Sequence, residues 1–194
     1  MTCDRIGDTC QNHQVRIVAG EYRGRMLKSP TWDGLRPTSD RLRETLFNIL
    51  GASVQGARVL DGYAGTGAIG IEALSRGAAA VTFVERDPRA AKLIAANLAL
   101  LRPEDAAKPA IIRAGLAEAI TRLGGQVFDL IILDPPYAAD AAATALDAAG
   151  ALAAPHTRTV LEHAARHASP DAHAGLRRTR TVTAGDSALS FYER

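Results

Sequence analysis

Residues 128–137 read FDLIILDPPY, and this stretch decides the fold class of the chain. Its apolar part, with Asp129 as the only charged residue, is typical of a strand buried on both faces of a parallel sheet. The two prolines that follow cannot continue a ladder of strands, so we expect the chain to leave the sheet in a stiff, open turn. The turn predicts a functional site, because open α/β sheets bind their ligands at the carboxyl ends of the strands.

The turn itself carries three groups that suit a planar ring bearing an amine. The Asp134 carboxylate and the Pro135 carbonyl can accept hydrogen bonds from the N–H groups of the amine. The ring of Tyr137 can stack on the face of the planar group. We therefore expect Asp134, Pro135 and Tyr137 to hold the amino group that is modified.

Strand-like and helix-like segments alternate along the chain from residue 58 onward. This rhythm predicts an α/β fold with a doubly wound, mostly parallel sheet of seven strands and right-handed crossovers. The last two strands are expected to form a hairpin joined at Gly185-Asp186, which leaves one antiparallel strand in the sheet. The expected strands are 58–61, 80–85, 110–113, 128–134, 159–163, 176–183 and 187–193. The expected helices are 66–76, 88–101, 116–123 and 138–152.

The 194 residues fit one domain with a small extension, since 47% of them are hydrophobic and can bury a sizeable core. We interpret residues 1–14 as a flexible polar leader. Residues 15–37 predict a small basic β-hairpin around Gly20 and Gly24, and residues 38–194 form the main domain. Three residues can cap the helix that opens this domain: Thr38, Ser39 and Asp40.

Cysteine usage and hydropathy exclude several classes of protein. The two cysteines, Cys3 and Cys10, fit neither a zinc or redox pattern nor a disulfide framework, which indicates a reducing compartment. No apolar run approaches the roughly 20 residues of a membrane span, and the N-terminus lacks the apolar core of a signal peptide. The five His residues show no metal-binding spacing. We expect a cytoplasmic protein that binds neither a metal nor a membrane.

A glycine-rich turn follows the first expected strand of the main domain, within VLDGYAGTGAIGIEAL (59–74). Asp61 ends the strand, and a helix follows the turn. Glycines allow a ligand to approach the backbone, and the helix N-terminus offers free N–H groups. The turn therefore indicates a ligand site, although a tight structural turn would have the same composition. Its three glycines are Gly62, Gly65 and Gly67.

An acidic residue about 20 positions beyond such a turn typically accepts hydrogen bonds from ribose hydroxyls. Glu85, at the end of the second expected strand, is in this position. Asp87 instead suits the N-cap of the helix that begins at Pro88. The glycine turn and Glu85 together predict a cofactor that carries a nucleoside.

Residues 16–43 are basic, with seven Lys and Arg against three Asp and Glu, a net charge of +4. Such a patch favours phosphate backbones, although a solvated basic face would have the same composition. Arg43 could also form a local structural pair with Glu44. The candidates for contacts with such phosphates are Arg23, Arg25, Arg36, Arg41 and Arg43.

Several motifs resemble, in their order along the chain, the RsmD family of methyltransferases. They are VRIVAGEYRGRMLKSP (15–30), RPTSDRLRETLFNIL (36–50), DGYAGTG (61–67), EALSRGA (72–78), DPPY (134–137) and GDSALSFYE (185–193). The resemblance covers nearly the whole chain from Val15, and RPTSDRLRETLFN is its most specific part. Members of that family methylate the exocyclic N2 of a guanine in 16S rRNA on a class I, Rossmann-like methyltransferase fold.

The resemblance implies S-adenosyl-L-methionine as the cofactor. Asp61 would contact its amino-acid part, and Tyr63 stands where the family usually has Phe. No carboxylate follows the third strand in residues 113–116, so we expect backbone groups and apolar contacts to hold the adenine. The residues implied in cofactor binding are Asp61, Gly62, Tyr63, Gly65, Gly67 and Glu85.

The expected reaction is direct methyl transfer from the sulfonium of the cofactor to the guanine N2. Asp134 and Pro135 would stabilise the amine, and Tyr137 would stack on a base taken out of its helix or loop. The expected partner is 16S rRNA, alone or within an assembling small ribosomal subunit, and we expect the protein to be a monomer.

Two other functions fit the same pattern. A DNA adenine or cytosine amino-methyltransferase would use the same four-residue motif, but such enzymes generally carry a further target-recognition domain, for which 194 residues leave little room. A non-catalytic RNA-binding module of the same fold is the second alternative. The intact DPPY motif argues against it, because a binding module needs no aligned acceptor for an amine.

Overall fold

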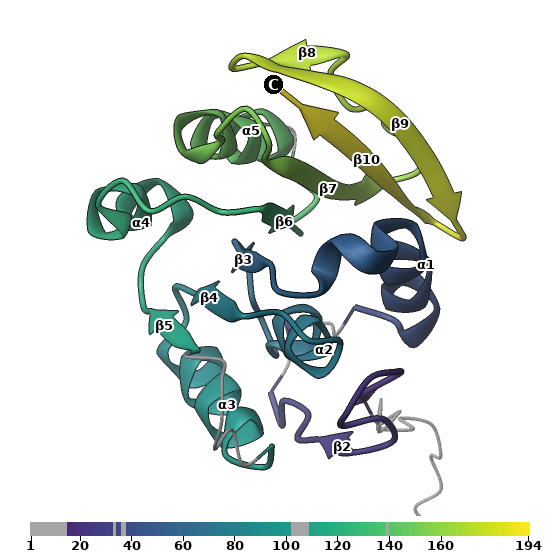
Figure 1. The fold of residues 1–194 in the computed structure, drawn as a ribbon, viewed down its shortest axis with the longest axis vertical. Coiled ribbons are helices and arrows are strands. Elements are labelled where there is room, and N and C mark those ends of the chain that lie inside the picture. The colour runs from purple at the N-terminus through teal and green to yellow at the C-terminus, as the bar shows by residue number, and fades with distance from the viewer. Residues whose placement is uncertain (1–14, 33, 36–37, 102–108, 139) are drawn as a thin grey trace, which may run out of the picture.

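The computed structural model describes residues 15–32, 34–35, 38–101, 109–138 and 140–194. The leader predicted at residues 1–14 and the candidate Arg36 lie outside these ranges. Within them, one eight-stranded sheet runs in the order β5-β4-β3-β6-β7-β10-β9-β8, with helices on both faces (Figure 1). The doubly wound, mostly parallel α/β fold is therefore confirmed.

Five neighbouring strands of the sheet are parallel, and they correspond to the alternating segments of the sequence. They are β3 (Arg58–Asp61), β4 (Ala80–Val84), β5 (Ala110–Ile112), β6 (Leu130–Leu133) and β7 (Arg158–Ala164).

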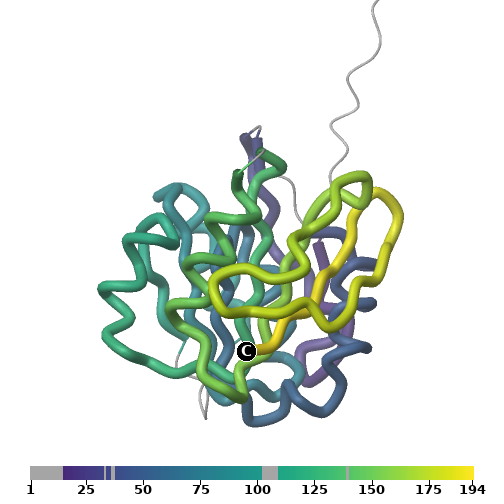
Figure 2. The backbone as a smooth tube through the Cα atoms, turned by 90° about the horizontal axis from the view of Figure 1, so that it is seen from above, coloured from purple at the N-terminus to yellow at the C-terminus, as the bar shows by residue number. Residues whose placement is uncertain are grey.

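The C-terminal strands complete the sheet at the end opposite β5 (Figure 2). As the predicted terminal hairpin requires, β10 (Ser187–Glu193) is antiparallel both to β7 and to β9 (Leu176–Ala184). The prediction of seven strands was one too few, because β8 (Ala172–His173) pairs with the start of β9. A strand of two residues is too short to show an alternating pattern, so the sequence carried no signal for it.

The helices cover the two faces of the sheet unequally (Figure 1). Ser39 caps α1, because its Oγ accepts a hydrogen bond from the Leu42 N–H at 3.2 Å. The expected helix at 66–76 begins two residues late, since Gly67 has a left-handed φ of 78°. One face carries α1 (Asp40–Leu50), the short 3-10 helix η1 (Gly51–Val54), α2 (Ala68–Ser75) and α3 (Pro88–Leu98). The other face carries α4 (Leu116–Leu123) and α5 (Ala141–Leu152).

Strand β6 contributes to the cores on both faces of the sheet. Leu130 and Ile132 pack in the core that includes α1, α2 and α3, while Ile131 and Leu133 pack in the core that includes α4 and α5. All four side chains are buried, which confirms the interpretation of the apolar run as a strand covered on both faces. Among the described helices, none is long and apolar enough to cross a membrane.

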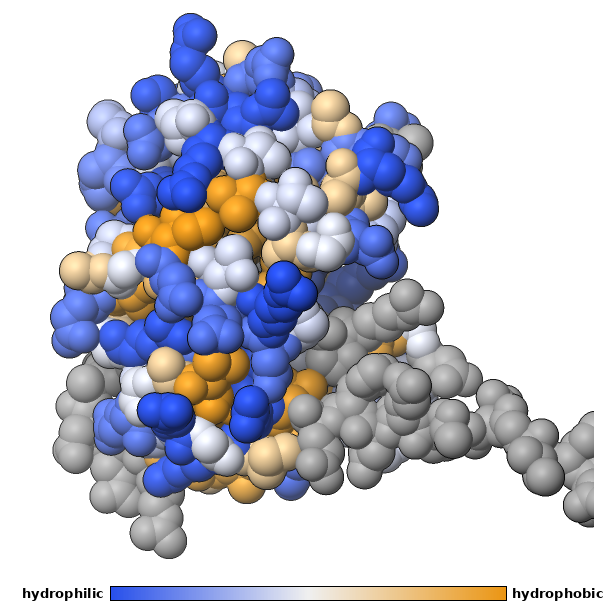
Figure 3. Space-filling view, turned by 90° about the vertical axis from the view of Figure 1, so that its right-hand side faces the viewer, coloured by the Kyte–Doolittle hydropathy of each residue, from blue (hydrophilic) through white to orange (hydrophobic). Residues whose placement is uncertain are grey.

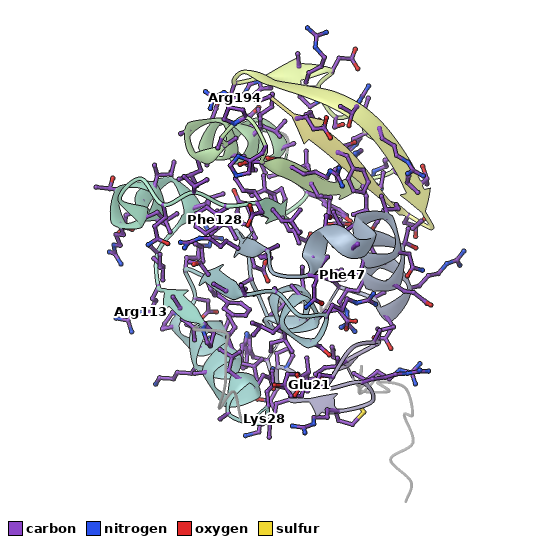
Figure 4. All side chains as sticks on the ribbon, in the orientation of Figure 1. Glu21, Lys28, Phe47, Arg113, Phe128 and Arg194 are labelled. Carbon is purple, nitrogen blue, oxygen red and sulfur yellow. The ribbon has the colours of Figure 1, made fainter. Side chains whose placement is uncertain are left out.

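The predicted N-terminal hairpin is present as β1 (Val15–Arg16) paired with β2 (Met26–Leu27). Figure 4 labels Glu21 and Lys28 at this end of the molecule. The turn between the strands packs closely on the end of α2, where the Glu21 N–H donates to the Ser75 carbonyl at 2.7 Å. A side chain at Gly20 would place its Cβ 1.9 Å from the same oxygen, so this close approach requires glycine.

A buried carboxylate joins the hairpin to α2. The two Glu72 carboxylate oxygens accept hydrogen bonds from the backbone N–H groups of Val18 and Ala19, at 2.7 and 2.9 Å. The same carboxylate forms ion pairs with Arg76 at 2.8 Å and with Arg43 at 3.4 Å. Because Glu72 is completely buried, these donors replace the water that its charge has lost.

The structure contradicts the prediction that Arg43 contacts RNA. Its side chain is completely buried, and its Nη2 donates to the Arg16 carbonyl at 2.7 Å and to Asp40 at 2.6 Å. A guanidinium enclosed by these acceptors and by Glu72 has no free donor surface for a phosphate. The alternative of a structural ion pair was correct in kind, but the partners are Asp40 and Glu72 rather than Glu44.

We expect Glu72→Ala to lower the free energy of unfolding by roughly 3–5 kcal/mol, because it removes one of the two carboxylates that pair with the buried Arg43 and the acceptors of the Val18 and Ala19 N–H groups. Denaturation with urea at pH 7 measures this loss. The control is Glu44→Ala, an exposed carboxylate on α1, which should change stability by no more than about 0.5 kcal/mol. Equal unfolding midpoints for the two variants would contradict the role given to Glu72.

Candidate active site

The parallel strands bring four acidic side chains to one edge of the sheet. Asp61 ends β3, and Glu85 and Asp134 directly follow β4 and β6. Glu162 lies near the end of β7, where the pairing of Leu133 with Leu161 places it beside Asp134. This edge is the one at which open α/β sheets bind their ligands.

Asp61 is buried and supports the glycine turn from inside. Its Oδ2 accepts a hydrogen bond from the Gly70 N–H at 2.9 Å, in the first turn of α2. The N-cap residue of this helix, Gly67, has no side chain to accept a hydrogen bond, so Asp61 supplies the acceptor from the end of the strand. Burial raises the pKa of Asp61 from 3.8 to about 7, and the charge of Glu85 adds to this rise, while the Gly70 N–H opposes it.

Glu85 holds the glycine turn from the other side. One of its carboxylate oxygens accepts the Gly65 N–H at 2.9 Å, and the other accepts the Asp87 N–H at 2.7 Å. A carboxylate has about four acceptor positions, so Glu85 can bind ribose hydroxyls in addition. Asp87 caps α3 through the Arg89 N–H at 2.8 Å, as predicted.

The glycine turn itself is shaped by close packing and by backbone conformation. Gly62 packs against β6 so closely that a Cβ would lie 2.7 Å from the Leu133 side chain. Gly65 has a φ of 54°, which favours glycine. Tyr63 is half-buried, and this burial raises the pKa of its hydroxyl. Close packing and positive φ angles account for these glycines, and a ligand site at the turn stays a prediction.

Asp134 and Tyr137, in the motif after β6, differ in their exposure and in their hydrogen-bond partners. Asp134 Oδ2 accepts a hydrogen bond from the Thr38 hydroxyl at 2.9 Å, and Pro135 is buried. Tyr137 is 54% exposed, although its hydroxyl donates to Glu162 at 2.5 Å and lies 3.0 Å from the Ser187 hydroxyl. Its ring is therefore fixed at one end and presents a surface on which a flat group can stack.

Burial and neighbouring acidic groups raise the pKa values of Asp134 and Tyr137. Burial of the Asp134 carboxyl and the neighbouring Glu162 raise the pKa of Asp134 well above its usual range; Asp61 adds to this, while Thr38 opposes it. Burial and Glu162 raise the pKa of Tyr137 to about 12. The described residues contain no group of three or more His, Cys, Asp or Glu side chains arranged to hold a metal ion.

The arginines of residues 16–43 that the structure describes differ in their position and in their contacts. Arg41 is exposed at the start of α1, three residues after Thr38. Arg23 is exposed on the hairpin. Arg25 is also exposed, but it lies over the Tyr22 ring and donates to the Leu100 carbonyl at 2.8 Å. Figure 3 shows the side of the molecule that carries α1 and the hairpin, where hydrophilic side chains cover most of the surface.

A family model described as "Conserved hypothetical protein 95" matches residues 15–193, and curated proteins of the RsmD type are close relatives of this chain. The chain belongs to the RsmD family. The relatives include "Ribosomal RNA small subunit methyltransferase D" of Escherichia coli K12, 42% identical over 126 residues. This match covers 64% of the chain and 61% of the relative, so the chain spans less than two thirds of that relative. The protein of the same name from Haemophilus influenzae is 42% identical over 124 residues, which are 64% of each chain.

Solved structures support the fold of this RsmD-family chain. The Escherichia coli protein yhhF aligns with a TM-score of 0.78 and 34% identity over 93% of this chain and 98% of that one. A more distant structure, solved as a complex with SAH, aligns with a TM-score of 0.61 and 17% identity over 79% of this chain and 48% of that one. At this identity the second structure shows a common fold and no more.

Sequence reasoning missed three side chains that contact the motif of this RsmD-family member: Thr38, Glu162 and Ser187. Thr38 was considered only as a helix cap. Glu162 carries the same signal as Asp134, an acidic residue at the end of an apolar strand. The next residue, His163, is buried, and its Nε2 lies 2.9 Å from the Ser190 hydroxyl.

We expect Asp61→Asn to flatten the pH dependence of stability. Because the pKa of Asp61 is raised in the folded state, its contribution is complete below the ordinary value of 3.8 and is lost as pH rises through about 7. The loss amounts to roughly 4 kcal/mol at most. Asparagine keeps an acceptor for the Gly70 N–H but does not ionise. Unfolding free energies measured from pH 4 to 8 test this, and parallel curves for both proteins would show that Asp61 does not titrate in this range.

Proposed function

We propose that the chain is an S-adenosylmethionine-dependent methyltransferase that acts on the exocyclic N2 of a guanine in small-subunit ribosomal RNA. One observation carries the proposal: the Asp134–Tyr137 motif and the glycine turn after β3 lie at the same edge of the sheet, on neighbouring strands. Membership of the RsmD family supports the choice of ribosomal RNA.

The residues present fit the cofactor. Glu85 already accepts the Gly65 and Asp87 N–H groups and has acceptor positions left for ribose hydroxyls. The acidic edge formed by Asp61 and Asp134 suits a ligand that carries positive charge. When bound, S-adenosylmethionine supplies a sulfonium methyl group, which is already a strong electrophile.

The chain mainly orients the acceptor and takes up charge. Asp134 and the Pro135 carbonyl accept the N–H groups of the amine and align its lone pair with the methyl group. Positive charge that develops on the nitrogen during methylation would be stabilised by these two oxygens. The ring of Tyr137 stacks on the guanine, which must leave its helix or loop to reach the site.

RNA binding would use the exposed arginines of the basic segment. Arg41 is best placed, because it lies in the first turn of α1, which follows Thr38, the partner of Asp134. Arg23 and Arg25 would extend the contact along the RNA backbone without reading its sequence. We infer a cytoplasmic monomer whose substrate is 16S rRNA, alone or in an assembling small subunit.

The reaction is tested by incubating the protein with labelled S-adenosylmethionine and small ribosomal subunits from a strain that lacks the gene, then digesting the RNA to nucleosides for mass spectrometry. We expect N2-methylguanosine, and a rate at least about 100-fold lower for Asp134→Ala, because the amine loses its main acceptor. The control is Asp140→Ala, an exposed aspartate without a side-chain cap contact, which should keep the wild-type rate. Labelled adenine or cytosine would contradict the assigned acceptor, and bound RNA with no label would favour a binding module.

The role of Arg41 is tested by the salt dependence of RNA binding. Removing one phosphate contact should reduce the slope of log K against log salt concentration by about one. We expect this for Arg41→Ala and not for Arg122→Ala, which removes an exposed arginine from α4 on the other face of the sheet. The assignment is wrong if both variants change the slope equally.

A further inference from the structure

The carboxyl group of Glu162 is buried beside the Asp134–Tyr137 motif. It has no role in the reaction proposed above. Glu162 is 6% exposed and belongs to β7, the strand next to β6. Since Leu133 pairs with Leu161 in parallel register, the residues that follow them, Asp134 and Glu162, lie side by side. Nothing in the sequence motif DPPY requires a second carboxyl at this place.

Glu162 contacts Tyr137 and lies beside Asp134. Its Oε1 accepts the Tyr137 hydroxyl at 2.5 Å, and the parallel register of β6 and β7 places it next to Asp134. Two further groups act on the Asp134 carboxyl: the Thr38 hydroxyl, which donates to it at 2.9 Å, and the Asp61 carboxyl. The Ser187 hydroxyl lies 3.0 Å from the Tyr137 hydroxyl. The pair is therefore surrounded by neutral donors and one further acidic group.

Two adjacent carboxyl groups with little access to water cannot both carry a full charge. Repulsion between two such neighbours favours the uptake of a proton at this place. The rise in the pKa of Asp134, caused by burial and by Glu162, agrees with this arrangement. One carboxylate of the pair then remains free to accept a second proton.

We propose that Glu162 is a positioning residue of the methyl-transfer site, which fixes the Tyr137 ring through its hydroxyl and forms with Asp134 a carboxyl pair that receives the proton of the methylated amine. This inference rests on the proposed function. After the N–C bond forms, the nitrogen carries one proton too many, and this proton passes to the carboxylate of the pair. The proton neutralises one negative charge of the pair, which offsets the positive charge that leaves the amine.

Two substitutions separate the two roles. Glu162→Gln keeps an oxygen that can accept the Tyr137 hydroxyl but removes the second carboxyl. Ser187→Ala removes the other partner of the Tyr137 hydroxyl and leaves the carboxyl pair intact. A purely structural Glu162 would affect stability or RNA affinity, and it would not move the pH dependence of the reaction.

The first experiment measures kcat and KM from pH 5 to 9 with S-adenosylmethionine and small ribosomal subunits from the deletion strain. We expect Glu162→Gln to move the acid limb of the kcat/KM profile down by about 1 pH unit, since the like charge that raises the pKa of Asp134 is gone. Its kcat should fall by about tenfold at pH 7 with less than a twofold change in KM for RNA. In Ser187→Ala the acid limb should stay in place. A Glu162→Gln profile that superimposes on the wild-type profile overturns the proposal.

The second experiment needs no RNA, so it distinguishes failure of this inference from failure of the proposed function. Carbon-13 NMR follows the titration of the Asp134 carboxyl, which is assigned by the loss of its signal in Asp134→Asn. We expect Asp134 to titrate at lower pH in Glu162→Gln than in the wild-type protein. An unchanged titration overturns the carboxyl pair even if the enzyme methylates RNA. A wild-type protein that transfers no methyl group while the titration shifts would overturn the proposed function and the proton transfer, but not the pair.

Discussion

Parallel pairing of β3, β4, β6 and β7 brings four carboxyl groups to one edge of the sheet, and the site depends on how each is satisfied. Removed from water, such groups repel one another unless donors or shared protons compensate. Asp61, Glu85, Asp134 and Glu162 each have their own donor. The donors are the Gly70, Gly65 and Asp87 N–H groups and the hydroxyls of Thr38 and Tyr137. The result is an ordered acidic edge, which suits a methyl donor that carries a positive charge.

The N-terminal segment is part of this arrangement rather than an attached arm. Glu72 fixes its backbone at Val18 and Ala19, and Asn97 of α3 accepts the Lys28 N–H at 2.7 Å. The same Asn97 side chain donates to the Thr66 carbonyl in the glycine turn at 3.1 Å. Further along, Thr38 donates to Asp134. The segment that we propose to contact RNA is thus joined to both halves of the site, so RNA binding there can influence the alignment of the amine.

Local pattern was sufficient for the fold and for the residues at strand ends. The run at 128–137 predicted a buried strand and a stiff turn, because apolar continuity and proline act within the strand itself. Long-range contacts decided what the sequence could not predict. Arg43 has the same composition signal as Arg41, and only packing against Glu72 shows that one is buried and the other exposed. Glu162 became visible as a partner of Asp134 only through the register of β6 and β7.

The account depends on one group, the Asp134 carboxylate that directly follows β6. It is proposed to accept the hydrogen bonds of the amine in ribosomal RNA that is methylated. The most direct measurement is a quantitative nucleoside map of small-subunit ribosomal RNA from the source organism with the gene deleted and then restored. We predict that one N2-methylguanosine disappears on deletion, returns with the wild-type gene and does not return with Asp134→Ala. A deletion strain in which every N2-methylguanosine is still present would contradict the account.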